Sequence, residues 1–502
     1  MADVTDGASG RDAVAGEHAV VIAGAGPTGV MLAAELALAG VDAVVVERRT
    51  ADEHLGSRSG GLLARTIEIL DQRGIADRVL AAGSPVQVHS YGNTVLDLEG
   101  FPTRHPYALA LWQNRFEQLL EAWADELGVR IARGRAISGV AQDAEGVWID
   151  LDDGSRLRAG YLVGCDGGRS LVRKAAGIGF PGWDAATSYL LAEVELDEEP
   201  EVGLRRDERG VYAIGPADEG RHRVVARDDV VQAGDAPTLD DLRAAMRRLW
   251  GRDFGLRGAA SLSRFRDTTR LAATYRSGRV LLAGDAAHIH APMGGQGLQL
   301  GLQDAVNLGW KLAQVLDGTS PASLLDTYDA ERRPVAARAQ RHTMALTALS
   351  RGDDRTAALR DVVDELLELD EARTRLAGAL SGLDVHYDLG DGHPLLGRRV
   401  PDVDLVTDEG ARRVSELLRD ARPLLLDLGE GAPLDAASWS GRVRVVRARA
   451  RGPWELPVLG GCPAPTGLLV RPDGYVAWVA QDGSPRGLAA ALSRWCGAVS
   501  GG

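Results

Sequence analysis

Two motifs that could hold a nucleotide cofactor lie far apart in this chain of 502 residues. The first is Gly24-Ala25-Gly26-Pro27-Thr28-Gly29, and the second is Gly284-Asp285-Ala286-Ala287-His288. A glycine turn of the first kind can bind a dinucleotide pyrophosphate, and an aspartate in the second can bind the hydroxyls of a sugar-like chain. Because FAD needs a distant segment for its ribityl chain and ring, the pair favours FAD over NAD as the resident cofactor.

The segments around the first motif are those that a pyrophosphate site requires. Residues 18–23 predict a short buried parallel strand, and the apolar pattern of residues 30–38 predicts a helix. Gly24 would permit the tight turn, Gly26 would let the backbone approach the phosphates, and Gly29 would let the helix pack on the strand. The helix N-terminus then offers free N–H groups and a partial positive charge to the phosphates.

A second predicted strand, residues 41–46, ends in Glu47, where an acidic residue is expected to meet the adenosine ribose. Glu47 favours an unphosphorylated ribose, so FAD or NAD fits better than NADP. A Rossmann-type NAD dehydrogenase would explain this first unit equally well. A signal peptide or membrane span over residues 19–40 is disfavoured, because glycines, a proline and Glu35 interrupt the run and no basic segment precedes it.

Composition points to a large soluble enzyme of the cytoplasm. The chain carries 57 Lys and Arg against 71 Asp and Glu, a net charge of −14, which argues against nucleic acid or an anionic membrane as its partner. The three cysteines are far apart and show neither disulfide nor zinc spacing, so we expect reduced thiols and no metal. Residues 1–17 are small and polar and are expected to form a disordered tail.

The segment around the second motif predicts a site for an anionic group. Residues 279–284 predict a strand that ends at Asp285, and a helix is expected to begin near Gly297. The glycine-rich loop of residues 292–297 feeds that helix, whose N-terminus would offer donors to the N1–C2=O edge of a flavin. His288 and His290 in this loop lack a third ligand, so we expect them to bond backbone groups rather than a metal.

A third motif, Gly164-Cys165-Asp166-Gly167-Gly168-Arg169-Ser170, follows a predicted hairpin of residues 147–163. An Asp-Gly cluster at the carboxyl end of a strand is a place where α/β sheets bind polar ligand groups. Alone, the segment could equally be an ordinary surface turn before a solvated basic helix.

Together, the three motifs resemble those of the FAD-dependent aromatic hydroxylases, the class A flavoprotein monooxygenases. More narrowly, residues 64–74, 164–177, 284–311 and 381–397 are similar to bacterial polyketide hydroxylases that act on angucycline- and anthracycline-type polycycles. A related group hydroxylates rifamycin-type antibiotics. The resemblance covers nearly the whole chain and implies an α/β fold, with a Rossmann-like FAD-binding domain, an inserted β-sheet substrate domain and a C-terminal thioredoxin-like domain.

The resemblance also implies the residues that bind FAD. Arg58 would lie beside the flavin between cofactor and substrate, and it forms the predicted catalytic set with Pro292 and Gly295. Gln299 departs from the family pattern, which usually has Asn there, but the backbone should do the binding. The predicted cofactor residues are Gly24, Gly26, Pro27, Thr28, Gly29, Glu47, Arg48, Arg58, Gln113, Asp166, Arg169, Asp285, Pro292, Gly295, Gln296, Gly297 and Leu298.

The chain divides into five predicted parts. These are a tail (1–17), the first part of the FAD domain (18–178), the substrate sheet (179–269), the second part of the FAD domain with connecting helices (270–397), and the thioredoxin-like domain (398–502). Trp183, Tyr212 and Phe265 in the substrate sheet are candidate pocket walls, although each could equally be core. Cys462 has no second cysteine at redox spacing, so the last domain is expected to be structural.

The expected activity is hydroxylation of a polycyclic aromatic polyketide in antibiotic biosynthesis, by a monomer or homodimer that uses FAD, O2 and NADPH, or alternatively NADH. The resemblance implies that a flavin C4a-hydroperoxide transfers the oxygen. A second glycine fingerprint for NADPH is absent from the sequence, as in the family. Alternatives are Baeyer–Villiger oxidation, epoxidation or inactivation of a rifamycin-type antibiotic. From a different class, the protein could be a flavoprotein reductase or a flavin-binding protein that does not activate oxygen.

Overall fold

A parallel sheet forms the centre of the molecule in this computed structural model, which describes residues 16–50, 59–217, 220–231, 236–480 and 483–499. Its parallel strands follow the order β20-β11-β1-β2-β8. Short apolar runs that are mostly buried explain why β1, β2 and β20 form parallel strands, whereas the edge strand β8 is only partly buried. Their bounds are β1 (Glu17–Ala23), β2 (Ala43–Glu47), β8 (Arg130–Arg133), β11 (Arg156–Gly164) and β20 (Val280–Leu282).

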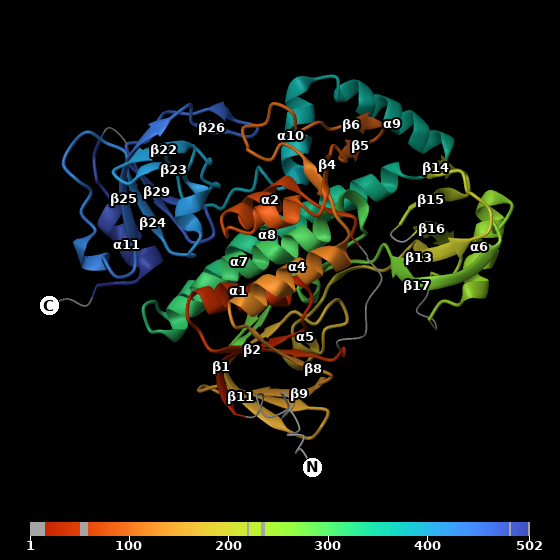
Figure 1. Cartoon of the computed structure of the whole chain (residues 1–502), viewed down its shortest axis with the longest axis horizontal. Coiled ribbons are helices and arrows are strands. Elements are labelled where there is room, and N and C mark those ends of the chain that lie inside the picture. Colours follow the sequence, from red (N-terminus) through yellow and green to blue (C-terminus); the bar gives the residue numbers. More distant parts are fainter. Residues whose placement is uncertain (1–15, 51–58, 218–219, 232–235, 481–482, 500–502) are drawn as a thin grey trace, which may run out of the picture.

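Helices cover this sheet (Figure 1). α1 (Pro27–Leu38) contacts both α7 (Gln296–Leu316) and α4 (Gln113–Glu126) and packs on β1 and β2. The crossovers bring β1, β2, β11 and β20 into the sheet in one direction, so that their carboxyl ends share an edge. The expected strands and helices of this region are present, and the α/β class with a Rossmann-like first part is confirmed.

An antiparallel sheet with the strand order β14-β15-β16-β13-β17 lies at one side of the molecule (Figure 1). Helix α6 (Leu239–Trp250) packs on it, and its N-terminus carries a capping box of Thr238 and Asp241. This is the inserted sheet expected from the sequence. Its strands are β13 (Ser188–Leu196), β14 (Gly203–Asp207), β15 (Gly210–Pro216), β16 (His222–Asp228) and β17 (Leu256–Arg266).

Three consecutive helices connect the centre to the C-terminal part. They are α8 (Asp326–Leu349), α9 (Asp354–Leu366) and α10 (Asp370–Ser381). The C-terminal part contains a sheet of order β23-β22-β25-β24-β28-β29, in which β24 and β25 are parallel, and the closing helix α11 (Leu488–Cys496). The strands are β22 (Asp404–Thr407), β23 (Gly410–Arg413), β24 (Leu424–Asp427), β25 (Arg444–Arg451), β28 (Gly467–Val470) and β29 (Val476–Ala480).

The turn between β28 and β29 fixes the C-terminal sheet to the centre of the molecule through buried charges. Arg471 Nη1 donates to Glu331 Oε1 at 2.7 Å, and Arg471 Nη2 donates to Asp473 Oδ2 at 2.5 Å. Lys311 Nζ of α7 donates to Glu331 Oε2 at 2.8 Å, and the side chains of Arg471 and Lys311 are fully buried. We call these four residues, Lys311, Glu331, Arg471 and Asp473, the docking cluster.

Among the described residues, no helix is both long and apolar enough to cross a membrane.

Candidate active site

Four loops that the sequence singled out meet at the carboxyl edge of the parallel sheet. The glycine turn follows β1, Glu47 ends β2, Asp166 follows β11, and Asp285 follows β20. The strands that carry them are neighbours in the order β20-β11-β1-β2. Residues separated by more than 250 positions in the chain thereby surround one crevice, which is where open α/β sheets bind ligands.

The three glycines of the first motif have different structural reasons to be glycine. Gly24 has φ +101°, and a Cβ there would lie 2.6 Å from the carbonyl oxygen of Cys165. A Cβ on Gly29 would lie 2.0 Å from the carbonyl oxygen of Gly24, so this glycine lets α1 pack on the turn. No atom of the described residues lies within 4 Å of the Cβ position of Gly26, which leaves open space among them in front of α1. α1 begins at Pro27. No side chain of the described residues caps the N-terminus of this helix, so the N–H groups of its first turn are available to a phosphate.

Thr28 connects the first motif to the second. A Cβ on Gly284 would lie 2.7 Å from Thr28 Oγ1, and a Cβ on Gly301 of α7 would lie 2.2 Å from the same atom. Both glycines are therefore required for α1 and α7 to cross this closely.

Glu47 lies against the glycine turn and pairs with Arg49. Its Oε2 accepts a hydrogen bond from Ala25 N at 2.7 Å, and its Oε1 accepts one from Arg49 Nε at 3.1 Å. Burial alone would raise the pKa of Glu47, but the hydrogen bonds from Arg49 and Ala25 outweigh it and lower the pKa. Arg48, which we predicted for the cofactor, is exposed. Arg49 was missed, and only its position two residues after Glu47 could have suggested its role.

Asp166 caps the helix that follows it. Its Oδ2 accepts from Leu171 N at 2.7 Å and Val172 N at 3.1 Å, while its Oδ1 is buried without a hydrogen-bond partner among the described residues. Arg169 is exposed beside it. Arg173, which the sequence reasoning did not single out, is buried and donates to the carbonyl oxygens of Ala286 and Gly168. Arg173 thus ties the Asp166 loop to the Asp285 loop.

A buried cluster holds the Asp285 loop. Asp285 itself is exposed at the end of β20. Behind it, Asp304 Oδ2 accepts from Gly284 N at 3.1 Å and lies 2.7 Å from His288 Nε2, and Asp304 Oδ1 accepts from Arg332 Nε at 2.8 Å. Burial would raise the pKa of Asp304, but His288 and Arg332 hold it below its usual value. The described residues contain no group of side chains suited to a metal ion.

The start of α7 presents backbone rather than side chains to the crevice. Gly294 and Gly295 have φ values of +77° and +63°, which glycine adopts without strain, and Gly295 is the N-cap of α7. Pro292 and Gly295 are exposed, and within the described part of the chain no atom lies within 4 Å of a Cβ on Gly295. Gln296, Gly297 and Leu298 form the first turn of α7, where the helix dipole favours an anionic edge.

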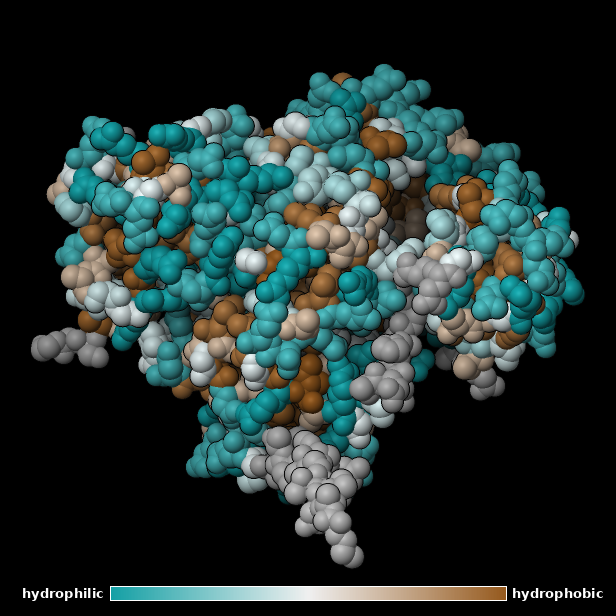
Figure 2. Space-filling model, viewed as in Figure 1, coloured by the Kyte–Doolittle hydropathy of each residue, from teal (hydrophilic) through white to brown (hydrophobic). Residues whose placement is uncertain are grey.

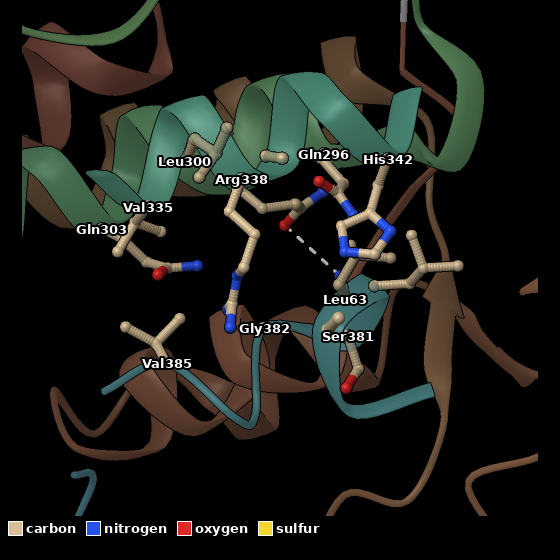
Figure 3. A pocket seen from close by; sticks show the side chains of 14 residues that line it. Leu63, Gln296, Leu300, Gln303, Val335, Arg338, His342, Ser381, Gly382 and Val385 are labelled. Carbon is tan, nitrogen blue, oxygen red and sulfur yellow. Dashed lines mark hydrogen bonds between the residues drawn. The ribbon is translucent and has the colours of Figure 1, made fainter. Parts of the chain in front are cut away.

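Gln299 holds this loop against a neighbouring segment. Its Oε1 accepts from Leu63 N at 3.3 Å, and its Nε2 donates to the carbonyl oxygen of Gly61 at 3.0 Å. The side chain therefore acts between protein groups, as expected for a position where the backbone would bind the flavin. Behind Gln299 lies a hollow of about 20 Å³ between Leu63, Gln303, His342 and Ser381, which has room for about one water (Figure 3).

Gln113 is the first residue of α4, and its Oε1 accepts from Ser59 N at 3.1 Å. It therefore holds residues 59–61 against the start of α4. Arg58, the predicted catalytic arginine, lies outside the described residues.

A cavity of about 360 Å³ opens beside the start of α7. One wall is η3 (Met293–Gly295) and another is the last turn of α8, with Leu346 and Leu349. The floor is a small sheet of order β3-β7-β4, made of β3 (Gly61–Leu62), β7 (Ala108–Ala110) and β4 (Ser84–Val86). Arg206 of β14 closes the far end, and His89 lies in the wall. Figure 2 shows the surface hollowed between the inserted sheet and the centre of the molecule.

The three candidate pocket residues lie elsewhere than in the lining of this cavity, and only Tyr212 and Phe265 belong to the inserted sheet. Tyr212 is fully buried between its sheet and α6, with its ring 4.7 Å from that of Trp250. Phe265 stacks on Tyr189, with ring centroids 5.1 Å apart, and Trp183 is 60% exposed. The sequence signal for these residues was their aromatic character alone, which does not distinguish core from pocket.

Comparison with known proteins agrees with this geometry. Residues 17–343 match the model of the FAD binding domain family, and residues 393–499 match that of the aromatic-ring hydroxylase C-terminal family. The Streptomyces rimosus protein named 12-dehydrotetracycline 5-monooxygenase/anhydrotetracycline 6-monooxygenase is 45% identical over 500 residues, covering 95% of this chain and 98% of that protein. A rifampicin monooxygenase from Streptomyces venezuelae is 42% identical, covering 96% and 99%.

A solved structure of anhydrotetracycline hydroxylase from Streptomyces rimosus superimposes with a TM-score of 0.90 at 45% identity, covering 96% of this chain and all of that one. The residues present fit FAD. Its pyrophosphate is expected in the space at Gly26, its ribityl chain at the exposed Asp285, and its ring at the start of α7, which presents backbone. The chain therefore belongs to the FAD-dependent monooxygenase family of aromatic-ring hydroxylases.

Proposed function

We propose that this protein hydroxylates a polycyclic aromatic polyketide and consumes one NADPH and one O2 for each turnover. One oxygen atom would enter a C–H bond of the ring, and the other would leave as water with the two electrons of NADPH. The observation that carries the proposal is the 360 Å³ cavity, which lies directly against η3 and is the size of a small-molecule site. The relatives named above act on tetracycline precursors and rifampicin, which are polycyclic aromatic compounds.

The chain's own residues would bind, orient and exclude water. The glycine turn and the N-terminus of α1 would hold the pyrophosphate of FAD, Glu47 the ribose, and Asp285 the ribityl chain. The backbone at the start of α7 would hold the flavin ring at the mouth of the cavity. When bound, FAD supplies the acceptance of hydride from NADPH and the activation of O2.

The cavity walls would keep water from the reacting ring. Met293, Leu346, Leu349 and Val86 present apolar surface to it. An apolar wall leaves a reactive oxygen species without a proton source, which protects it from breakdown before it meets the substrate.

The test is oxygen incorporation. The holoenzyme with FAD would be given NADPH and isotopically labelled O2 with anhydrotetracycline or rifampicin as probe. Mass spectrometry should find one labelled atom in the product of at least one probe. The proposal would be contradicted if NADPH oxidation gave only hydrogen peroxide with both probes and with a wider panel of polycyclic phenols. Conversion of a probe without incorporation of labelled oxygen would contradict it too.

We also infer that the protein works in a reducing cytoplasm. Cys165, Cys462 and Cys496 are free thiols, and burial raises the pKa of each of them. Such thiols are unreactive and need no oxidising compartment.

A further inference from the structure

The cavity has two different ends. At one end lies η3, where a Cβ on Gly294 would be 3.3 Å from Leu346 Cδ1 of α8. From Leu346 the chain continues through Leu349 to Gly352. A Cβ on Gly352 would lie 2.0 Å from the carbonyl oxygen of Asp207, which is the residue after Arg206. The end of α8 therefore runs from the flavin side of the cavity to β14. The floor follows the same direction, from Gly61 past Val86 and His89 to Gly92.

His89 lies in the wall of this cavity without a partner for one ring nitrogen. The residue is only 3% exposed, and its Nε2 is buried with no hydrogen bond to any described residue. Burial lowers the pKa of His89 to about 4, so its ring is neutral near pH 7 and carries one N–H donor and one acceptor. A buried polar atom without a partner costs free energy, which a ligand can recover by bonding to it.

Arg206 is the charged group at the far end. Its Nη1 donates to Asn93 Oδ1 at 3.3 Å, and its Nε is buried without a partner among the described residues. Asp364, whose charge acts on Arg206, already accepts four hydrogen bonds from the N–H and side-chain groups of Asn93 and Thr94. Burial and the neighbouring Arg360 both lower the pKa of Arg206, and the opposite effect of Asp364 offsets them only in part.

We propose that His89 and Arg206 form a subsite for an anionic oxygen of the substrate, such as an enolate, phenolate or carboxylate. Arg206 would donate to the anion with charge assistance, and His89 would donate a neutral N–H to an oxygen beside it. The inference rests on the proposed function and narrows its substrate class. The substrate would lie with its acidic end at β14 and with the ring to be oxidised at η3.

The experiment compares two probes of equal size that differ in charge. Anthraquinone-2-carboxylate and anthraquinone-2-carboxamide are titrated into the FAD-loaded protein, and binding is followed by perturbation of the flavin absorbance. The wild type should bind the carboxylate at least about ten-fold more tightly, as expected for a charge-assisted hydrogen bond to a buried group. Arg206→Met should bring the two affinities within about two-fold of each other.

Arg205→Met is the matched control. Arg205 precedes Arg206 on the same strand, forms an ion pair with the exposed Glu201, and is absent from the cavity lining. The control should keep the preference of the wild type. If Arg206→Met keeps the preference, or if Arg205→Met loses it equally, the proposal is overturned. Should Arg206→Met fail to retain FAD, Arg206→Gln is measured in its place with the same two criteria.

His89 is tested with a pair of variants. His89→Leu should weaken binding of both probes by about five-fold or more, because the lost donor is neutral. His89→Gln, which restores an N–H group, should recover most of that loss. Equal affinities in the wild type and in His89→Leu would remove His89 from the subsite. Because binding is read without turnover, failure of oxygen incorporation and failure of this subsite are separate results.

Discussion

The docking cluster and the far end of the cavity both bury charged or polar side chains, but they differ in how those side chains are paired. In the docking cluster, Arg471 contacts two carboxylates, and Lys311 contacts Glu331. At the cavity, His89 Nε2 and Arg206 Nε have no hydrogen-bond partner among the described residues. The first region is electrostatically complete within the protein, whereas the second is complete only with a ligand.

The two regions therefore illustrate two different reasons why a protein buries polar side chains. A buried ion pair holds its partners strongly, because removal of one of them leaves the other charge uncompensated. An unpaired buried group destabilises the fold and is retained where it contributes to binding. Substitutions in the two regions should therefore change stability with opposite signs.

The largest effect is expected for Arg471→Met. The substitution leaves Glu331 and Asp473 buried without their main partner, and this should cost about 3–5 kcal/mol. Thermal unfolding followed by circular dichroism should show a lowered Tm, and the C-terminal sheet should become sensitive to proteolysis. Arg375→Met is the control, since Arg375 pairs with Glu371 on the surface and should change stability by under about 1 kcal/mol. Equal Tm values for the two variants would show that the docking cluster does not hold the sheet.

Acid should weaken the same region next. Burial would raise the pKa of Glu331, but Arg471 and Lys311 lower it from 4.5 to about 2. A carboxyl group with a depressed pKa stabilises the fold fully above pH 4.5 and loses this contribution as the pH falls towards 2, in total about 3 kcal/mol. The free energy of unfolding of the wild type should therefore fall more steeply over this window than that of Glu331→Gln. Parallel curves would contradict the assignment.

Gln299 provides an intermediate case, because it is neutral but fully bonded. Gln299→Leu would leave Leu63 N and the Gly61 carbonyl oxygen without their partner, at a cost of about 2 kcal/mol. FAD affinity, measured by fluorescence on cofactor release, should fall because the start of α7 is no longer held. Gln299→Asn retains the amide and should lose less. If both variants bind FAD as the wild type does, the side chain does not position this loop.

The smallest effect, and the one of opposite sign, is expected for His89→Leu. Replacement of an unpaired buried ring by an apolar side chain of similar size should raise stability by about 1 kcal/mol at pH 7. Because the pKa of His89 in the fold is about 4, against 6.5 ordinarily, the wild type should lose stability as the pH falls from 6.5 to 4. His89→Leu should lack this loss, as chemical unfolding at several pH values would show. A destabilised variant would mean that His89 has a structural role instead.

The two regions also show which parts of the fold and of the site could be predicted from the sequence. Local patterns were sufficient for β1 and α1, which the sequence predicted over residues 18–23 and 30–38. The glycine turn, Asp166 and Asp285 could be identified from motifs, because each motif requires particular residue types at the end of a strand. Arg173 and the docking cluster carry no such local signal, since Arg173 bonds Ala286 and Arg471 bonds Glu331, far away in sequence. His89 and Arg206 carry none either, because the cavity that they line is formed by segments distant in sequence. The same is true of Tyr212, whose burial depends on α6.

The close contact of Thr28 with Gly284 and Gly301 has a consequence for synthesis on the ribosome. β1 and α1 are complete by Leu38, but α7, which packs on α1, is made only after the whole inserted sheet. At ~5–20 residues per second, α1 waits roughly 10 to 50 seconds for its neighbour. The inserted sheet, whose strands and helix lie within residues 188–266, can form in that interval. FAD can therefore bind only late in synthesis. Until then, the nascent chain leaves the face of α1 that packs on α7 accessible to chaperones.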